Sequence, residues 1–313
     1  MAKLVTVFGG SGFVGRHVVA RLAKTGARIR VAVRNPLLAN RLYPMGDPGQ
    51  IAVVRANLAD ERQVATAVSG ADTVINLVGI LFERGRQRFE TIQAEGAGAL
   101  ARQAKLAGAT SFVQMSAIGA DAASPSLYAR TKAQGEALVQ EAFPNALILR
   151  PSIIFGPEDG FFNRFASIAT WSPILPLFGG GVNRMQPVYV GDVADAVMNG
   201  LQQGAAGVHE LGGPRIFTFR ELMVYVCEVT GRTPFLVSMP FSLGHLGAFF
   251  AEFLPTPPLT RDQLRLLASD NVVADGARTL AQLSIQPVPV EAIVPRYLYV
   301  FRKAGQFTDL RNN

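Results

Sequence analysis

Short apolar runs alternate with longer amphipathic stretches through the first half of the chain. Apolar runs rich in β-branched side chains predict buried strands, and an apolar spacing of three to four residues predicts helices. A first strand is expected to begin at residue 3, and further strands are expected at Arg28–Val33, Ile51–Val54, Thr73–Leu77, Ser111–Met115 and Ala146–Leu149. Helices are expected between them, at Phe13–Lys24, Glu61–Val68, Arg88–Leu106 and Tyr128–Ala142.

Near-continuous apolar strands separated by helices indicate a parallel sheet covered on both faces. The sequence therefore predicts an α/β fold, a Rossmann-type doubly wound parallel sheet over residues 1–150. After Pro151 glycine and proline become frequent and the alternation weakens. We expect elements around 186–212 to return to the sheet, within a smaller, loop-rich substrate or docking region over 151–313.

The segment 235–258 contains the most apolar stretch of the chain. Pro240, His245 and Glu252 interrupt it, so it is a poor transmembrane helix, which needs about 20 nearly uninterrupted apolar residues. Two interpretations stay open. The segment packs into the core of the C-terminal region, or it forms a surface that docks on a membrane or a partner protein.

Composition narrows the classes of ligand. A net charge of +7 over 313 residues is compatible with anionic ligands and acidic lipid surfaces. No block of like charges and no basic and aromatic stripe is present, so we expect no nucleic acid partner. The single cysteine, Cys227, excludes a disulfide framework and favours a reducing compartment. We expect no metal site, and no signal or transit peptide, because Met1 lies so close to the first strand.

The strongest motif is a glycine-rich turn between the first strand and the first helix. Gly9, Gly12 and Gly15 follow a G-x-x-G-x-x-G spacing, which gives a sharp turn, close approach to a diphosphate and tight packing of helix on strand. The positive end of the helix then faces the phosphates. The chain is therefore expected to bind a dinucleotide through Gly9, Ser11, Gly12, Phe13, Val14, Gly15 and Arg16.

The end of the second strand predicts which dinucleotide is bound. Proteins that select NAD carry an acidic residue there, whereas this chain has Arg34. Arg34, with Arg16 nearby, could clamp a 2′-phosphate, so we expect NADP(H) in preference to NAD(H). Asn57 and Leu58 are expected beside the adenine. Val78 and Gly79, after the fourth strand, are expected along the cofactor.

A second group of residues carries candidate chemistry. Tyr128 and Lys132 are four residues apart, which places them on one face of the expected helix. A lysine beside a phenol is expected to lower the pKa of the phenol, so that Tyr128 exchanges a proton with a carbonyl or an alcohol. Ser116, after the preceding strand, could hold the carbonyl oxygen. The same lysine could instead bind the ribose hydroxyls of a cofactor that never turns over.

These motifs together resemble the short-chain dehydrogenase/reductase superfamily, in its extended and atypical branch. The segment Arg150–Pro157 resembles the stretch that lines the nicotinamide in that family, which implies cofactor contacts from Pro151 and Ile153. The segment Gln186–Ala194 resembles a later strand-to-helix motif of the family, which includes epimerases and dehydratases.

Within this branch the chain is most similar to the NADPH-binding accessory subunits of respiratory complex I, over most of residues 1–270. The resemblance implies a tightly held structural NADPH near the ubiquinone site. It implies partners among the subunits of a membrane-bound NADH:quinone oxidoreductase, and contact with an acidic lipid surface. The expected location is peripheral, on the cytoplasmic face of a prokaryotic inner membrane.

Two other functions stay open. Because Ser116, Tyr128 and Lys132 are all present, the protein could be an active NADPH-dependent oxidoreductase on a lipophilic carbonyl or a quinone-pathway compound. It could also be a nucleotide-sugar epimerase or dehydratase, although no sugar-specific residues are evident. The sequence leaves open whether hydride transfer takes place.

Overall fold

The computed structural model describes residues 3–255, 257–303 and 305–307. The chain divides into two units. Unit 1 comprises Met1–Pro151, Gly191–Leu211 and Asp275–Gln286, and unit 2 comprises Ser152–Val190, Gly212–Ala274 and Pro287–Asn313. Position 256 of the expected apolar segment 235–258, and positions 304 and 308–313 of the expected C-terminal region, lie outside the described residues.

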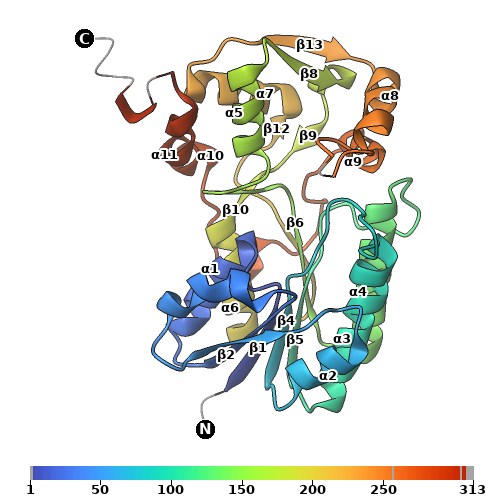
Figure 1. Cartoon of the computed structure of the whole chain (residues 1–313), viewed down its shortest axis with the longest axis vertical. Helices are drawn as coiled ribbons and strands as arrows, with labels where there is room; N and C mark the ends of the chain where they lie inside the picture. The colour runs from blue at the N-terminus through green and yellow to red at the C-terminus, as the bar shows by residue number, and fades with distance from the viewer. Residues whose placement is uncertain (1–2, 256, 304, 308–313) are drawn as a thin grey trace. The chain divides into compact units, whose positions relative to one another are not determined.

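Unit 1 contains a parallel sheet of seven strands (Figure 1). The strands are β1 (Leu4–Phe8), β2 (Arg28–Val33), β3 (Ile51–Arg55), β4 (Thr73–Asn76), β5 (Ser111–Met115), β6 (Leu147–Pro151) and β11 (Gly207–Leu211). Their order is β11-β6-β5-β4-β1-β2-β3, so the winding reverses between β1 and β4. Val7 of β1 lies opposite Val31 of β2 on one side and Ile75 of β4 on the other. This is the predicted doubly wound Rossmann-type sheet.

The helices of unit 1 follow the strands in alternation. They are α1 (Phe13–Ala23), α2 (Glu61–Val68), α3 (Gly96–Leu106), α4 (Leu127–Ala142) and α6 (Val190–Gln203), with α6 beginning one residue before unit 1 resumes. A 3₁₀ segment covers Pro36–Met45, a π-helical segment precedes α3 at Glu90–Glu95, and a short 3₁₀ turn lies at Leu280–Leu283.

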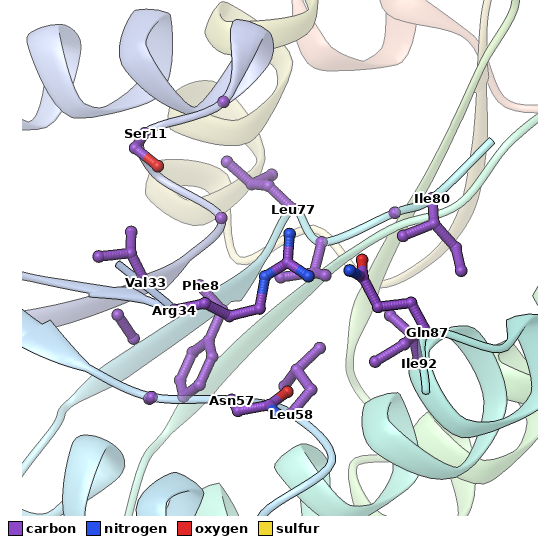
Figure 2. Close-up of a pocket in the computed structure, with 16 residues that line it drawn as sticks. Phe8, Ser11, Val33, Arg34, Asn57, Leu58, Leu77, Ile80, Gln87 and Ile92 are labelled. Atoms are coloured by element: carbon purple, nitrogen blue, oxygen red, sulfur yellow. The ribbon is translucent and has the colours of Figure 1, made fainter. Parts of the chain in front are cut away.

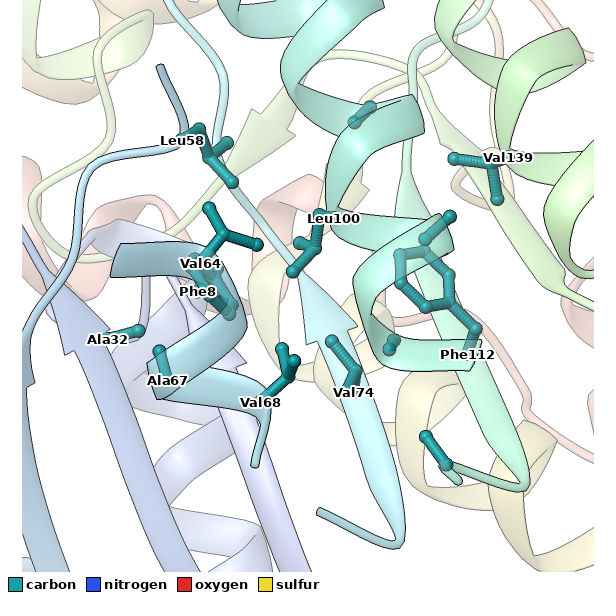
Figure 3. Packing of buried hydrophobic residues seen from close by; sticks show 14 of the residues in the cluster. Phe8, Ala32, Leu58, Val64, Ala67, Val68, Val74, Leu100, Phe112 and Val139 are labelled. Carbon is teal, nitrogen blue, oxygen red and sulfur yellow. The ribbon is translucent and has the colours of Figure 1, made fainter. Parts of the chain in front are cut away.

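Small side chains let α2, α3 and α4 lie close together over the sheet (Figure 3). Ala97, Ala101 and Ala104 of α3 are fully buried, and Val64, Val74 and Leu100 are fully buried around them. A Cβ atom on Gly98 of α3 would lie only 2.8 Å from the Cβ of Leu138 on α4. This close packing holds the carboxyl ends of the strands in fixed positions.

The strands of unit 2 form three two-stranded pairs among the described residues. The pairs are β7 (Ile154–Phe155) with β10 (Val188–Tyr189), β9 (Arg184–Met185) with β12 (Phe217–Thr218), and β8 (Ile174–Phe178) with β13 (Phe235–Met239). The helices are α5 (Phe162–Trp171), α7 (Phe219–Thr230), α8 (Phe241–Ala251), α9 (Arg261–Leu267), α10 (Val290–Ile293) and α11 (Pro295–Leu298). Short 3₁₀ turns lie at Gly179–Gly181, Tyr299–Phe301 and Gly305–Phe307.

An aromatic core takes the place of a large sheet in unit 2. Phe155, Phe162 and Phe219 are almost completely buried and pack with Leu222 and Leu298. The rings of Phe155 and Phe162 meet edge to face at 6.0 Å between centroids, which is a favourable arrangement of aromatic quadrupoles.

Candidate functional site

The glycine-rich turn joins β1 to α1 where the strand order reverses. Gly9 has a φ of +76°, in the left-handed region that favours glycine. A Cβ atom on Gly15 would lie 2.3 Å from the carbonyl oxygen of Gly9, so any larger residue would push α1 away from the turn. Gly12 borders the neighbouring cavity. The three glycines thus make the turn, leave room for a ligand and allow close helix packing.

The start of α1 presents backbone donors without acceptors. The N–H groups of Phe13, Val14 and Gly15 have no acceptor among the described residues. Gly12 provides no side-chain cap, and the first turn contains no acidic residue. Free N–H groups at the positive end of a helix stabilise an anion, so the site fits the diphosphate of a dinucleotide.

A cavity of about 240 Å³ lies beside this turn. Figure 2 shows the guanidinium of Arg34 and the amide of Gln87 pointing toward one another across it. The expected cofactor residues that line it are Gly9, Ser11, Gly12, Arg34, Asn57, Leu58, Val78 and Gly79. They come from the carboxyl ends of β1, β2, β3 and β4, the edge of such a sheet where ligands bind.

Two asparagines fix the loops on this edge. The side chain of Asn57 accepts a hydrogen bond from the N–H of Ala59 at 3.2 Å. The side chain of Asn76 accepts one from the N–H of Val78 at 3.2 Å and donates to the side chain of Gln114 at 2.9 Å. These bonds hold the loop after β3 and the loop after β4 in place on either side of the cavity.

Several expected site residues lie outside the lining of this cavity. They are Phe13, Val14, Gly15 and Arg16 on α1, Ser116 after β5, Tyr128 and Lys132 on α4, Pro151 at the end of β6, and Ile153, which belongs to unit 2. Their contacts with a cofactor stay predictions.

Ser116 and Lys132 converge at the end of β5. The Nζ of Lys132 donates a hydrogen bond to the carbonyl oxygen of Met115 at 3.2 Å. The same Nζ lies 3.5 Å from where a Cβ on Gly79 would be, which places it against the loop that lines the cavity. Ser116 follows Met115 directly, and its hydroxyl is buried without a hydrogen-bond partner among the described residues. A buried, unpartnered hydroxyl is the feature expected of a group that meets a ligand.

Burial controls the protonation of this group, and it corrects one expectation. We expected Lys132 to lower the pKa of Tyr128, but loss of solvation raises that pKa to about 12. Burial lowers the pKa of Lys132 to about 8, against the opposing charge of Glu136. The Nζ of Lys132 lies 5.8 Å from the centre of the Tyr128 ring. Tyr128 is therefore a protonated phenol at neutral pH, a donor rather than a phenolate.

The sequence reasoning missed the residues contributed by the segment before α3. Gln87 and Ile92 line the cavity. Gln93, in the π-helical segment, is 2% exposed, and both polar atoms of its side chain lack a partner among the described residues. A Cβ on Gly135 of α4 would lie 2.1 Å from the carbonyl oxygen of Gln93, so this segment lies directly on α4. The sequence did contain a signal for Gln93, because it is a polar residue on the apolar face of an expected helix.

The apolar segment forms a surface in unit 2, not a core. We define the α8 patch as Leu243, Leu246, Phe249, Phe250, Phe253 and Leu254, whose side chains are 43–77% exposed. The buried face of α8 consists of the small residues Gly244 and Ala248, with Gly244 lying against the ring of Phe178. Of the two interpretations, the structure therefore contradicts core packing for these large side chains.

Within the described part of the chain, we find no helix whose length and apolar content would let it cross a bilayer. The same residues contain no group of three or more His, Cys, Asp or Glu side chains arranged to hold a metal ion.

Comparisons with known proteins agree with the fold. Residues 5–212 match the NAD dependent epimerase/dehydratase family. The chain is 34% identical to NADH dehydrogenase (ubiquinone) 1 alpha subcomplex subunit 9, a mitochondrial protein of Arabidopsis thaliana, over 96% of this chain and 79% of the relative. It is 33% identical to a ceramide reductase of Caulobacter vibrioides, over 76% of this chain and 74% of the relative.

Among solved structures, the chain is similar to the UDP-glucose 4-epimerase of Thermus thermophilus in complex with NAD. The TM-score is 0.69 at 20% identity, covering 96% of this chain and 99% of that chain. At this level of identity the likeness shows the fold alone.

Proposed function

Since the chain belongs to the NAD dependent epimerase/dehydratase family, we propose that it is an NADP(H)-binding accessory or assembly subunit of a membrane-bound NADH:quinone oxidoreductase. The observation that carries this proposal is the similarity over 96% of the chain to a subunit of NADH dehydrogenase (ubiquinone). Two features of unit 1 support it as well: the free N–H groups at the start of α1, which fit a diphosphate, and the cavity beside the glycine turn. The nucleotide is held mainly as a structural element.

Arg34 supports NADP(H) as the nucleotide. It lines the cavity at the end of β2, where an NAD-selecting protein carries a carboxylate. Arg34 is exposed, and no carboxylate partner for its side chain is found among the described residues. A guanidinium without an acid partner fits a 2′-phosphate, which it can bind through two parallel hydrogen bonds.

Peripheral attachment to a membrane is the second part of the proposal. The α8 patch exposes six large apolar side chains on one short stretch of unit 2. The only carboxylate within this stretch, that of Glu252, pairs with Arg261 at 2.9 Å, and the guanidinium of Arg261 lies 5.2 Å from the centre of the Phe249 ring. The Arg261–Glu252 pair carries no net charge, so the attraction to a lipid interface would come from burial of the apolar side chains. We place this surface on the cytoplasmic face of a prokaryotic inner membrane.

An active reductase is the second candidate function, favoured by the unpartnered hydroxyl of Ser116 and by similarity to a ceramide reductase. A bound reduced nicotinamide would supply the hydride. In that case the hydroxyl of Ser116 would hold the carbonyl oxygen of a lipophilic substrate. The protonated phenol of Tyr128 would donate the proton to that oxygen, and Lys132 would orient the ribose.

Mass spectrometry of the nucleotide released from the purified protein tests the proposal. NADPH should be present in near-stoichiometric amounts and should exchange slowly with added labelled NADPH. The Arg34→Ala variant should lose most of this NADPH, with an affinity roughly ten- to a hundredfold lower, because one charge-assisted pair is lost. Rapid exchange together with carbonyl reduction that Tyr128→Phe slows by about two to four orders of magnitude would favour the reductase instead.

A further inference from the structure

A second cavity, of about 780 Å³, adjoins the cavity beside the glycine turn in unit 1. The two cavities share Arg34, Asn57, Gln87 and Ile92 as lining residues. Four arginines line the second cavity, Arg34, Arg62, Arg84 and Arg86. We call these residues the arginine cluster. Asp60 and Glu61 also line the cavity, so the cluster leaves an excess of two positive charges there, four minus two.

The nearby carboxylates are bound to other groups. Asp60 caps α2 by accepting hydrogen bonds from the N–H groups of Arg62 and Gln63, and its second oxygen accepts from the Gln63 side chain at 2.6 Å. Glu61 accepts a hydrogen bond from the side chain of Gln103 at 2.9 Å. Within the described residues, no member of the arginine cluster forms an ion pair.

Arg84 and Arg86 are placed by a tight turn after β4. The backbones of Arg84 and Gln87 exchange two hydrogen bonds, at 3.0 and 2.9 Å, and Gly85 between them has a φ of +55°. The one acidic residue beside this turn, Glu83, pairs with Arg88 at 3.2 Å and accepts a hydrogen bond from the N–H of Phe89. The carboxylate of Glu83 is thus bound to Arg88, whereas Arg84 and Arg86 line the cavity.

A cleft lined by charges of one sign concentrates ions of the opposite sign, so the arginine cluster favours an anionic ligand in this cavity. We infer that the arginine cluster binds a phosphate monoester, and that this group is the 2′-phosphate of the bound nucleotide, so that Arg84 and Arg86 determine nucleotide specificity together with Arg34. This inference rests on the proposed NADP(H) binding. Arg34 borders both cavities, which puts the phosphate at their junction, and Asn57 beside it borders both as well.

Isothermal titration calorimetry on the full chain tests this inference with NADPH and NADH. The double variant Arg84→Ala/Arg86→Ala should lower the affinity for NADPH at least about tenfold. Its affinity for NADH should stay within about twofold of the wild-type value, because NADH has no 2′-phosphate. Arg88→Ala is the matched control. It removes an arginine from the same turn that is already paired with Glu83 and lines neither cavity, so both affinities should be unchanged.

A second titration separates the 2′-phosphate from an independent phosphorylated ligand. Glycerol 3-phosphate should bind the NADH-loaded wild type, and should bind neither the NADPH-loaded wild type nor the NADH-loaded double variant. Binding of glycerol 3-phosphate to NADPH-loaded protein would overturn the inference in favour of a separate ligand. An unchanged ratio of NADPH to NADH affinity in the double variant would overturn it too. If the double variant keeps the wild-type ratio but Arg34→Ala abolishes the preference for NADPH, the proposed NADP(H) binding stands and only the role of Arg84 and Arg86 is refuted. If the wild type itself shows no preference, the proposed NADP(H) binding fails first.

Discussion

The candidate site of unit 1 and the α8 patch of unit 2 depart from the usual pattern of burial in opposite ways. Unit 1 buries charge, with Lys132 and Glu136 each 5% exposed, and Glu136 bound through two hydrogen bonds to Arg150 at 2.9 and 2.6 Å. Unit 2 exposes apolar surface, since most of the large, exposed apolar side chains among the described residues lie in it. Burial of charge costs free energy of folding, whereas exposed apolar surface forgoes the stabilisation that burial would give and favours association. In the function proposed here, the buried charge marks the ligand site of unit 1, and the exposed apolar side chains mark the attachment surface of unit 2.

The largest expected effect is in the aromatic core of unit 2. Phe162 is fully buried among Phe155, Phe161 and other apolar side chains, so Phe162→Ala should lower the free energy of unfolding by about 3–5 kcal/mol. Chemical denaturation followed by circular dichroism measures it. A loss below about 1 kcal/mol would mean that this core is loosely packed, and would remove the contrast between the inside of unit 2 and its exposed α8 patch.

The next effect concerns the buried charge of unit 1. The pKa of Lys132 is about 8 in the folded protein, against an ordinary value of 10.5. Between these two values the unfolded chain binds a proton that the folded protein does not, so stability from this group rises with pH. The stability of the wild type relative to Lys132→Met should therefore increase by roughly 3 kcal/mol from pH 8 to pH 10.5.

Denaturation curves of the nucleotide-free protein over this pH range measure that difference. Lys132→Arg is the matched variant, because its guanidinium stays charged throughout and shows no such rise relative to Lys132→Met. If the difference in free energy of unfolding between the wild type and Lys132→Met does not change with pH, Lys132 is solvated. Buried charge would then no longer distinguish the candidate site of unit 1.

The sequence predicted unit 1 well because its apolar runs for strands and its three-to-four-residue apolar spacing for helices are both clear. The expected bounds of β2, β5 and α2 agree with the structure, and the glycine spacing located the turn between β1 and α1. The expected helix Arg88–Leu106 begins instead as a π-helical segment at Glu90, where one wide turn places Gln93 against α4. Apolar periodicity does not separate a π turn from an α turn, so this part of the site was not foreseen.

The arginine cluster and the direction of the Tyr128 pKa shift were not predictable for a related reason. Arg62, Arg84 and Arg86 are ordinary surface residues in the sequence, and only the turn after β4 and the start of α2 bring them to one cavity. The pKa of Tyr128 depends on burial, which a four-residue spacing does not report. In unit 2 the hydrophobic pattern located the apolar segment. It did not show which face of α8 is buried, because either face of a mostly apolar helix can pack against the protein.

The smallest effect on stability is expected from the α8 patch, and it is the effect that separates attachment from packing. Leu246, Phe250 and Phe253 are 58%, 64% and 77% exposed, so changing all three to serine should alter the free energy of unfolding by less than about 0.5 kcal/mol for each residue. NADPH affinity should not change. Binding to vesicles of phosphatidylglycerol and phosphatidylethanolamine should be lost, because burial of apolar area in the lipid interface supplies the attraction.

Trp171→Ser is the matched control, since Trp171 is 87% exposed on α5 and lies outside the patch. This variant should bind vesicles as the wild type does. Cosedimentation with vesicles, measured beside denaturation curves, decides the question. A triple variant that unfolds as readily as Phe162→Ala would show that α8 is part of the core of unit 2, and the contrast between the two units would then not hold.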